Sequence, residues 1–313
     1  MLDFAVVTRW SVLERMKIFF AVVLAGLVTL VHGMDSSASA LVSESIELAL
    51  TSCRSQFRWE RWNCPTIQFL TKRNAAGSLD REAAFVRAIS TASLIYTYAR
   101  NCSRGTSYGS CGCNDMSQNW ERCSVQQQLQ QDPRELSWKL DAKGYGNAHN
   151  RRAGWLAVQN AVRKNCRCHG VSGSCAMRTC WSTMNSFGLI ATGVKQMYAE
   201  GVRLFVDNSG RLNSRKIRPD QLAFTHVSPD YCQRDILSGW PGMVNRPCSM
   251  ARGENVSEDE RKSCRKLCRQ CGLKVRPHTK METRKCNCRF TWCCRVVCDS
   301  CVELVEEYRC QLN

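Results

Sequence analysis

The chain has 313 residues, of which 44% are hydrophobic, so it is long enough to bury one large core or two modest ones. Its 22 cysteines would remain thiols in the cytosol, whereas an oxidising secretory route would pair them, so the composition argues against a cytosolic protein. The formal net charge of +17 predicts polyanionic partners, which outside the cell are sulfated glycans such as heparan sulfate and not nucleic acids.

The N-terminal residues have the parts of a secretory signal peptide. Met16-Lys17 precedes the apolar run Ile18–Val31, which is short for a membrane span, and the small residue Gly33 follows. We expect residues 1–33 to be a signal peptide, with Met16 as a second candidate start; a signal anchor that stays attached is the alternative. No later segment contains the ~20 apolar residues of a transmembrane helix, so we expect a secreted protein of the extracellular space and matrix.

Helical periodicity marks the next part of the chain. Asp80 is a candidate N-cap, and apolar residues recur after it at helical spacing. We expect further helices within Ala153–Lys164 and Ile190–Phe205, the second interrupted by Gly193 and Gly201. The positions expected to form the core are Phe85, Ile89, Ala92, Ile95, Trp155, Val158 and Val162.

The cysteines are unevenly distributed. Residues 34–225 contain ten of them and residues 226–313 contain twelve, which predicts a core-driven helical domain followed by a small cysteine-rich domain of β-hairpins. The boundary is expected in the polar, basic stretch Asn208–Asp230. In the second domain, helical periodicity occurs only in Glu258–Leu267 and Val302–Tyr308. The expected fold class is therefore α+β.

The most informative motif is Cys166-Arg167-Cys168-His169-Gly170-Val171-Ser172-Gly173-Ser174-Cys175, followed by Cys180-Trp181. Two cysteines on each side of a short polar loop can pair in nested fashion, Cys168 with Cys175 and Cys166 with Cys180. Such a ladder holds a hairpin with almost no core beneath it, mainly by restricting the unfolded chain. Gly170 and Gly173 permit the backbone that a tight tip needs. We therefore expect a rigid projection that offers the hydroxyl of Ser172.

Three interpretations of this motif compete. Ser172 beside His169 resembles the nucleophile elbow of a secreted serine hydrolase, but Ser174 occupies the position of the closing glycine and the strand–turn–helix context is absent. Cys166, Cys168 and His169 could bind zinc, although disulfides are favoured in an oxidised chain. The third interpretation is a display loop whose serine is modified or bound by partners.

The motif resembles the signature Cys-Lys/Arg-Cys-His-Gly-x-Ser-Gly-Ser-Cys of the Wnt family of secreted signalling proteins. That resemblance implies that a membrane-bound acyltransferase esterifies Ser172 with a monounsaturated fatty acid and that a carrier in the secretory pathway exports the protein. It implies neither catalysis nor a cofactor. The loop would then bind a Frizzled receptor through His169, Gly170, Val171, Ser172 and Gly173, and a low-density-lipoprotein-receptor-related co-receptor would bind another surface. The other stretches that carry the resemblance are Gln56-Phe57 through Arg61-Trp62-Asn63-Cys64-Pro65, His149-Asn150 with Ala153-Gly154, Ser228-Pro229-Asp230-Tyr231-Cys232, and Trp292-Cys293-Cys294.

A second projection is expected near the C-terminus. Cys286–Cys301 and Cys288–Cys298 can nest as the first pairs do, and Cys293–Cys294 would form a vicinal disulfide at the tip. Trp292, Val296 and Val297 would then be exposed with no core to explain them. By the resemblance, this tip is a second finger that binds the receptor through Trp292, Cys293, Cys294, Val296 and Val297. The alternative is that Trp292 packs inside the small domain.

The remaining pairings follow only from the family pattern, because cysteine spacing does not determine connectivity. The resemblance implies Cys53–Cys64, Cys102–Cys111, Cys113–Cys123, Cys232–Cys271, Cys248–Cys264 and Cys268–Cys310. Asn101 and Asn255 are glycosylation sequons, and Cys102 beside Asn101 could pair before a glycan is added. A disulfide protein that binds matrix without receptor activity is a further rival interpretation.

Overall fold

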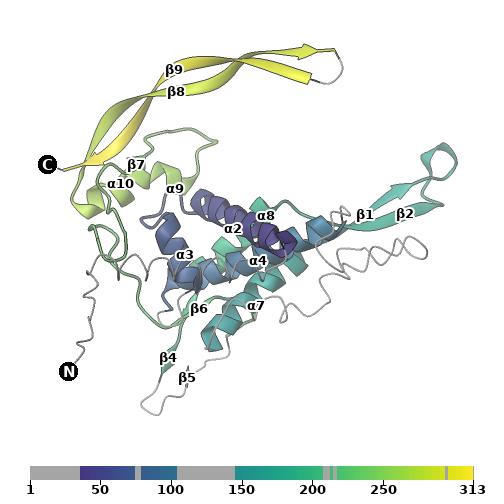
Figure 1. The fold of residues 1–313 in the computed structure, drawn as a ribbon, viewed down its shortest axis with the longest axis horizontal. Coiled ribbons are helices and arrows are strands. Elements are labelled where there is room, and N and C mark those ends of the chain that lie inside the picture. The colour runs from purple at the N-terminus through teal and green to yellow at the C-terminus, as the bar shows by residue number, and fades with distance from the viewer. Residues whose placement is uncertain are drawn as a thin grey trace, which may run out of the picture.

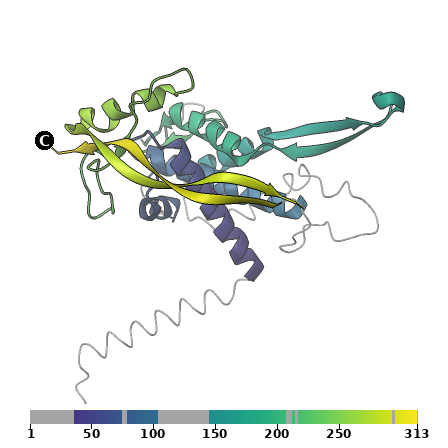
Figure 2. The ribbon, with the colours of Figure 1, turned by 90° about the horizontal axis from the view of Figure 1, so that it is seen from above.

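A body of helices carries two long β-hairpins, and both hairpins project toward the same side (Figures 1 and 2). The structure, a computed structural model, describes residues 36–74, 79–103, 145–206, 212–213, 217–292 and 295–312. The main helices are α2 (Ser36–Gln56), α3 (Thr66–Asn74), α4 (Arg81–Ser103), α7 (Tyr145–Asn160) and α8 (Phe187–Ala199). The expected signal peptide and the pairs Cys102–Cys111, Cys113–Cys123 and Cys293–Cys294 involve residues outside these ranges. Within the described residues, no helix is both long and apolar enough to cross a bilayer.

Helix α4 is the centre of the helical body. Asp80 caps it as expected, because its Oδ1 accepts a hydrogen bond of 2.7 Å from the backbone N–H of Ala83. The apolar positions predicted on this helix, Phe85 to Ile95, are all buried, and α2, α3, α7 and α8 pack around it. Polar residues of α4 such as Ser90, Ser93 and Thr97 are buried as well, so its faces differ little in hydropathy.

The other two predicted helices end earlier than expected. Helix α7 ends at Asn160, and Val162–Lys164 belongs instead to strand β1, where pairing with a second strand takes up its backbone hydrogen bonds. Helix α8 ends at Ala199, before Gly201, and the chain continues as β3 (Val202–Arg203) and β4 (Phe205–Val206). Strand β3 pairs in parallel with β6 (Ala223–Phe224), and β4 pairs with β5 (Leu212–Asn213).

The Asn150 side chain joins α7 to strand β6. It is fully buried, its Nδ2 donates to the carbonyl of Ala223 at 2.8 Å, and its Oδ1 accepts from the N–H of Ala223 at 2.8 Å. Asn150→Ala should lower the free energy of unfolding by about 2–4 kcal/mol, because it leaves a buried N–H and a buried C=O unpaired. Urea unfolding with intact disulfides measures this. Asn160→Ala, at an exposed position of the same helix, should change stability little; equal losses in both variants would contradict the role of Asn150.

The C-terminal part begins with short helices and ends in the longer hairpin. Helices α9 (Glu258–Arg261) and α10 (Ser263–Leu267) fall within the predicted Glu258–Leu267, and a 3-10 turn at Arg269–Cys271 follows. The helix expected at Val302–Tyr308 is wrong: these residues lie in β9 (Arg295–Gln311), which pairs antiparallel with β8 (Lys274–Thr291). Pairing along nearly the whole length of β8 satisfies the backbone and overrides the local helical period.

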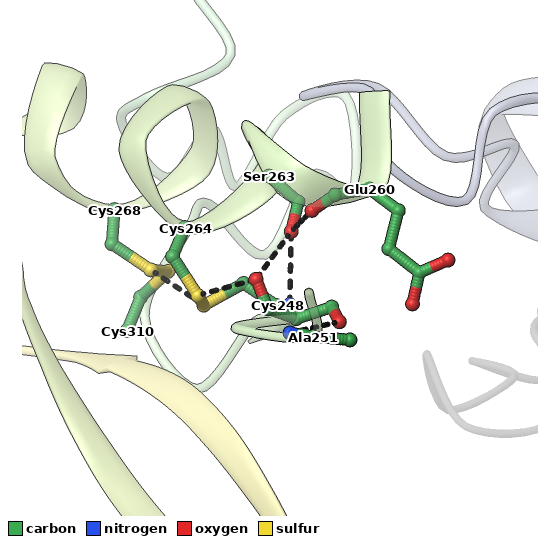
Figure 3. The surroundings of a disulfide bond; sticks show 8 residues. Cys248, Ala251, Glu260, Ser263, Cys264, Cys268 and Cys310 are labelled. Carbon is green, nitrogen blue, oxygen red and sulfur yellow. Dashed lines mark hydrogen bonds between the residues drawn. A yellow bond between two sulfur atoms is a disulfide. The ribbon is translucent and has the colours of Figure 1, made fainter. Parts of the chain in front are cut away.

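Two disulfides tie α10 to the neighbouring strands. Cys264 lies in α10, and Cys268 follows one helical turn later. Cys264 is bonded to Cys248 of β7 (Pro247–Cys248), and Cys268 is bonded to Cys310 of β9. Figure 3 shows the two bonds side by side, with Ser263 nearby. The Oγ of Ser263 accepts a hydrogen bond of 2.9 Å from the N–H of Ser249. Small domains with little core use such covalent links for stability. Cys53–Cys64 and Cys232–Cys271 are also bonded, in the pairs that the resemblance implies.

Candidate functional site

The first hairpin consists of β1 (Val162–Cys168) and β2 (Arg178–Met184), and it extends well beyond the helices (Figure 1). The antiparallel register places Cys166 opposite Cys180, and these two residues are disulfide-bonded. The Cys168–Cys175 disulfide lies nearer the tip. The two nested bonds stiffen a ribbon whose side chains are mostly exposed, so the structure has the ladder that the cysteine spacing predicts.

The tip of this hairpin is a single tight turn around Ser172. Ser172 has φ 56° and ψ 27°, and Gly173 follows with φ 77°, so two successive residues are left-handed. The N–H of Gly170 donates to the carbonyl of Ser174 at 2.8 Å, and a Cβ at Gly170 would lie 2.5 Å from that same oxygen. Gly170 is thus required for close approach and Gly173 for its positive φ. Together they hold the Ser172 side chain outward.

The surroundings of Ser172 do not form a hydrolase site. His169 and Ser172 are both exposed, and within the described residues no hydrogen bond joins the imidazole to the hydroxyl. The backbone N–H of His169 donates instead to the carbonyl of Met177 at 2.7 Å. A serine nucleophile needs a base within hydrogen-bond reach that is itself oriented by a third group. The described geometry contains neither part.

Zinc binding by the same motif is also disfavoured. Cys166 and Cys168 are both consumed in disulfides, and a thiolate is the form that ligates zinc. Across the described ranges, no group of three or more His, Cys, Asp or Glu side chains is placed to hold a metal ion.

The second hairpin, β8–β9, ends in an apolar tip. Cys286–Cys301 and Cys288–Cys298 cross-link it in the nested order expected from the spacing. The Trp292 side chain is 95% exposed, and Val296 and Val297 are exposed beside it. The alternative in which Trp292 packs inside the small domain is therefore wrong. Cys293 and Cys294 themselves lie outside the described residues.

The comparisons with known proteins decide the family. The model of the wnt family matches residues 29–311. Protein Wnt-8 of Xenopus laevis is 35% identical over 300 residues, covering 87% of this chain and 83% of the relative. The chain belongs to the Wnt family. Protein Wnt-8c of Gallus gallus is 36% identical over 299 residues, with the same coverage. A solved structure described as human WLS in complex with WNT8A matches with a TM-score of 0.63 and 32% identity, covering 87% of this chain and 93% of that chain.

Family membership establishes the general activity. Wnt proteins are signalling ligands and not enzymes, so this chain is a Wnt signalling ligand. The α+β architecture agrees with that of the Wnt structural neighbour: helices bearing one stapled hairpin, and a cysteine-rich C-terminal part made of hairpin strands.

One residue of the Wnt second tip escaped the sequence analysis. Phe290 is 72% exposed and lies directly across the hairpin from Val296. Its aromatic side chain two residues before Trp292, close to the expected tip, is the signal that could have found it. With Phe290, the tip gains a second aromatic ring at the same end.

The segment at residues 58–61 contacts both the helical body and α10 of the C-terminal part of this Wnt protein. Glu60 forms ion pairs with Lys195 of α8 at 3.3 Å and with Lys266 of α10 at 2.5 Å. Burial opposes ionisation of Glu60, but the two ammonium groups outweigh it and hold the pKa of its carboxyl below the usual value. Arg246 adds hydrogen bonds to the carbonyls of Arg58 and Glu60. The helical body and α10 are therefore joined by charged groups as well as by packing.

The two sequons differ in accessibility. Asn255 is exposed, whereas Asn101 is buried and its Nδ2 donates to Glu44 Oε2 at 3.1 Å. A glycan is attached to that same amide nitrogen and needs room around it. The structure therefore favours Asn255 over Asn101 as the glycan acceptor.

Proposed function

We propose that this Wnt ligand carries a monounsaturated fatty acyl ester on Ser172 and binds the cysteine-rich domain of a Frizzled receptor with its two hairpin tips. The observation that carries the proposal is the display of Ser172. Its hydroxyl lies at the exposed end of a doubly cross-linked hairpin. In the left-handed turn there, Gly173 takes a positive φ and Gly170 permits close approach to Ser174. Val171, His169, Gly170 and Gly173 form the rest of that contact surface.

The acyl chain would dominate the binding free energy. At about 0.8 kcal/mol per buried methylene, a chain of roughly sixteen carbons contributes on the order of 10 kcal/mol when a receptor groove removes it from water. The protein atoms of so small a tip bury far less apolar area. The rigidity of the cross-linked hairpin further favours binding, because the hairpin loses little conformational entropy when it binds.

The same chain implies handling partners. An exposed acyl chain is poorly soluble, so the ligand needs a membrane-bound acyltransferase to add it and a carrier to export it. The similarity to WNT8A in its complex with WLS supports a carrier of that kind. After cleavage of a signal peptide at residues 1–33, the secreted ligand acts at short range and recruits a low-density-lipoprotein-receptor-related co-receptor. Heparan sulfate retains it in the matrix through exposed basic residues such as Arg265 and Arg269 of the C-terminal part.

Mass spectrometry of the secreted protein tests the acylation directly. The disulfide-linked peptide containing Cys168 and Cys175 should carry the mass of one monounsaturated acyl chain. Alkaline hydroxylamine should remove it and neutral hydroxylamine should not, because an oxygen ester has a poorer leaving group than a thioester. The Asn255 peptide serves as an internal control, because its glycan is removed by a glycosidase and not by hydroxylamine. Secretion of a fully active protein with an unmodified Ser172 would refute the proposal.

The second tip should contribute a separate part of receptor affinity. Trp292→Ala is expected to weaken binding to an isolated Frizzled cysteine-rich domain by about 2–4 kcal/mol, since large exposed aromatic residues are common interface hot spots. Surface plasmon resonance measures the dissociation constant. Leu304→Ala removes an exposed apolar side chain from the same hairpin away from its tip, so its affinity should stay within about threefold of wild type. Similar losses for both variants would mean that the tip has no special role.

A further inference from the structure

All charged side chains of the first hairpin are cationic. Residues 161–184 include Arg163, Lys164, Arg167 and Arg178 and contain no aspartate or glutamate. All four side chains are exposed. No salt bridge involves any of them among the described residues. Outside the hairpin, by contrast, a carboxylate pairs with each of Lys72, Lys195, Arg218 and Lys266. The positive charge of the hairpin is therefore available to an external anion.

The strand register distributes these charges around the ribbon. Arg163 and Arg167 point to one face, and Lys164 points to the other face together with Arg178, which pairs across the hairpin with Cys168. Nearer the tip than these charged residues, Val171 is 90% exposed and Met177 is 69% exposed. Trp181 is 43% exposed on the face of Arg163 and Arg167, opposite Asn165. The hairpin thus has exposed apolar side chains near its tip and cationic side chains on both faces of its strands.

We propose that the side chains of this hairpin bind a phospholipid surface tip-first, independently of any acyl chain. Arg167 and Arg178 would lie at the level of the lipid phosphates, where guanidinium groups form paired hydrogen bonds with phosphate oxygens. Val171 and Met177 would enter the outer boundary of the acyl region, about 5–10 Å deep. Trp181 has the amphipathic ring that is enriched at membrane interfaces. A sulfated glycan would account for the cations but not for the three exposed apolar side chains.

The inference goes beyond receptor binding and does not depend on acylation, yet it bears on how an acyl chain would be held. One acyl chain alone gives marginal, reversible membrane attachment, and a basic patch is a common second signal. Here both signals would occupy the same tip. An acyl group on Ser172 would enter the bilayer where the hairpin already docks.

The test uses the full-length Ser172→Ala protein, which cannot carry the ester, so its outcome is separate from that of the acylation proposal. We expect it to float with phosphatidylcholine vesicles that contain phosphatidylserine, and more weakly with phosphatidylcholine alone. Adding Arg163→Gln, Lys164→Gln, Arg167→Gln and Arg178→Gln should weaken vesicle binding by roughly several hundredfold, because each cation near the surface is worth roughly a factor of five. Raising the ionic strength should reduce binding of the parent protein but hardly that of the variant.

The matched control removes the same charge from the opposite end of the molecule. Arg252, Arg265, Arg269 and Lys274 are exposed, and the α10 region lies far from the first hairpin in Figure 1. Their replacement by glutamine should lower heparin affinity and leave vesicle binding within about threefold. Equal loss of vesicle binding in both variants would show that net charge alone is responsible and would overturn the inference. So would a Ser172→Ala protein that binds heparin but no vesicle.

Discussion

Purified Ser172→Ala protein should signal at least about a thousandfold less strongly than wild type. The substitution removes one exposed hydroxyl, and nothing in the hairpin packs on it, so the two disulfides of the ladder should form normally. What is lost is the acyl chain, with on the order of 10 kcal/mol of apolar burial available in a receptor groove. If about half of that free energy is expressed in affinity, the dissociation constant rises more than a thousandfold. A reporter assay with purified protein measures the effect.

Ser174→Ala is the matched control for this prediction. It removes a hydroxyl two residues away, from an exposed position of the same tip, and leaves the hydrogen bond between the Gly170 N–H and the Ser174 carbonyl intact. Signalling by this variant should stay within about threefold of wild type. If both serine variants signalled normally, the tip would not depend on an ester at all. If only Ser174→Ala lost activity, the acylated residue would be Ser174 and not Ser172.

Gly154→Ala should destabilise the helical body by about 3 kcal/mol or more and reduce secretion sharply. Gly154 of α7 faces α4 so closely that a Cβ there would lie 2.1 Å from the carbonyl oxygen of Ala88 and 2.8 Å from its carbonyl carbon. Both atoms belong to the backbone, so no side chain can rotate away, and the two helices must separate. Overpacking of a core typically costs 1–3 kcal/mol, and this contact lies on the most buried helix. Thermal unfolding and the yield of secreted protein measure the effect.

Gly193→Ala separates this clash from the general effect of changing a helical glycine. Gly193 lies inside α8, and a Cβ there would meet nothing within 4 Å. Alanine should therefore stabilise the protein by roughly 0.5–1 kcal/mol through its better helix propensity. The two variants make the same chemical change with opposite expected signs. A Gly154→Ala protein as stable as Gly193→Ala would mean that α4 and α7 do not approach as closely as described.

Features that depend on short stretches of chain could be read from the residues alone. The disulfides Cys166–Cys180 and Cys168–Cys175 join residues only 14 and 7 positions apart, so their nested pairing could be predicted from the spacing. The cap at Asp80 is likewise a contact between residues three apart. The composition of the loop around Ser172 also indicated an exposed, glycine-flanked hydroxyl. In each case the interacting groups are neighbours in sequence.

Other features were decided only by contacts between distant segments. Val302–Tyr308 has a helical period, but β8 pairs with it and makes it a strand. Asn101 has the sequon of a glycan acceptor, yet Glu44 of α2 binds its amide. Asn150 gave no sign of its partner Ala223, which lies far along the chain. The sequence by itself therefore determined the motifs, the redox state and the family, because these depend on local pattern. Tertiary structure decided which patterns were used, since backbone pairing and burial by remote segments outweigh local preferences of at most about 1 kcal/mol per residue.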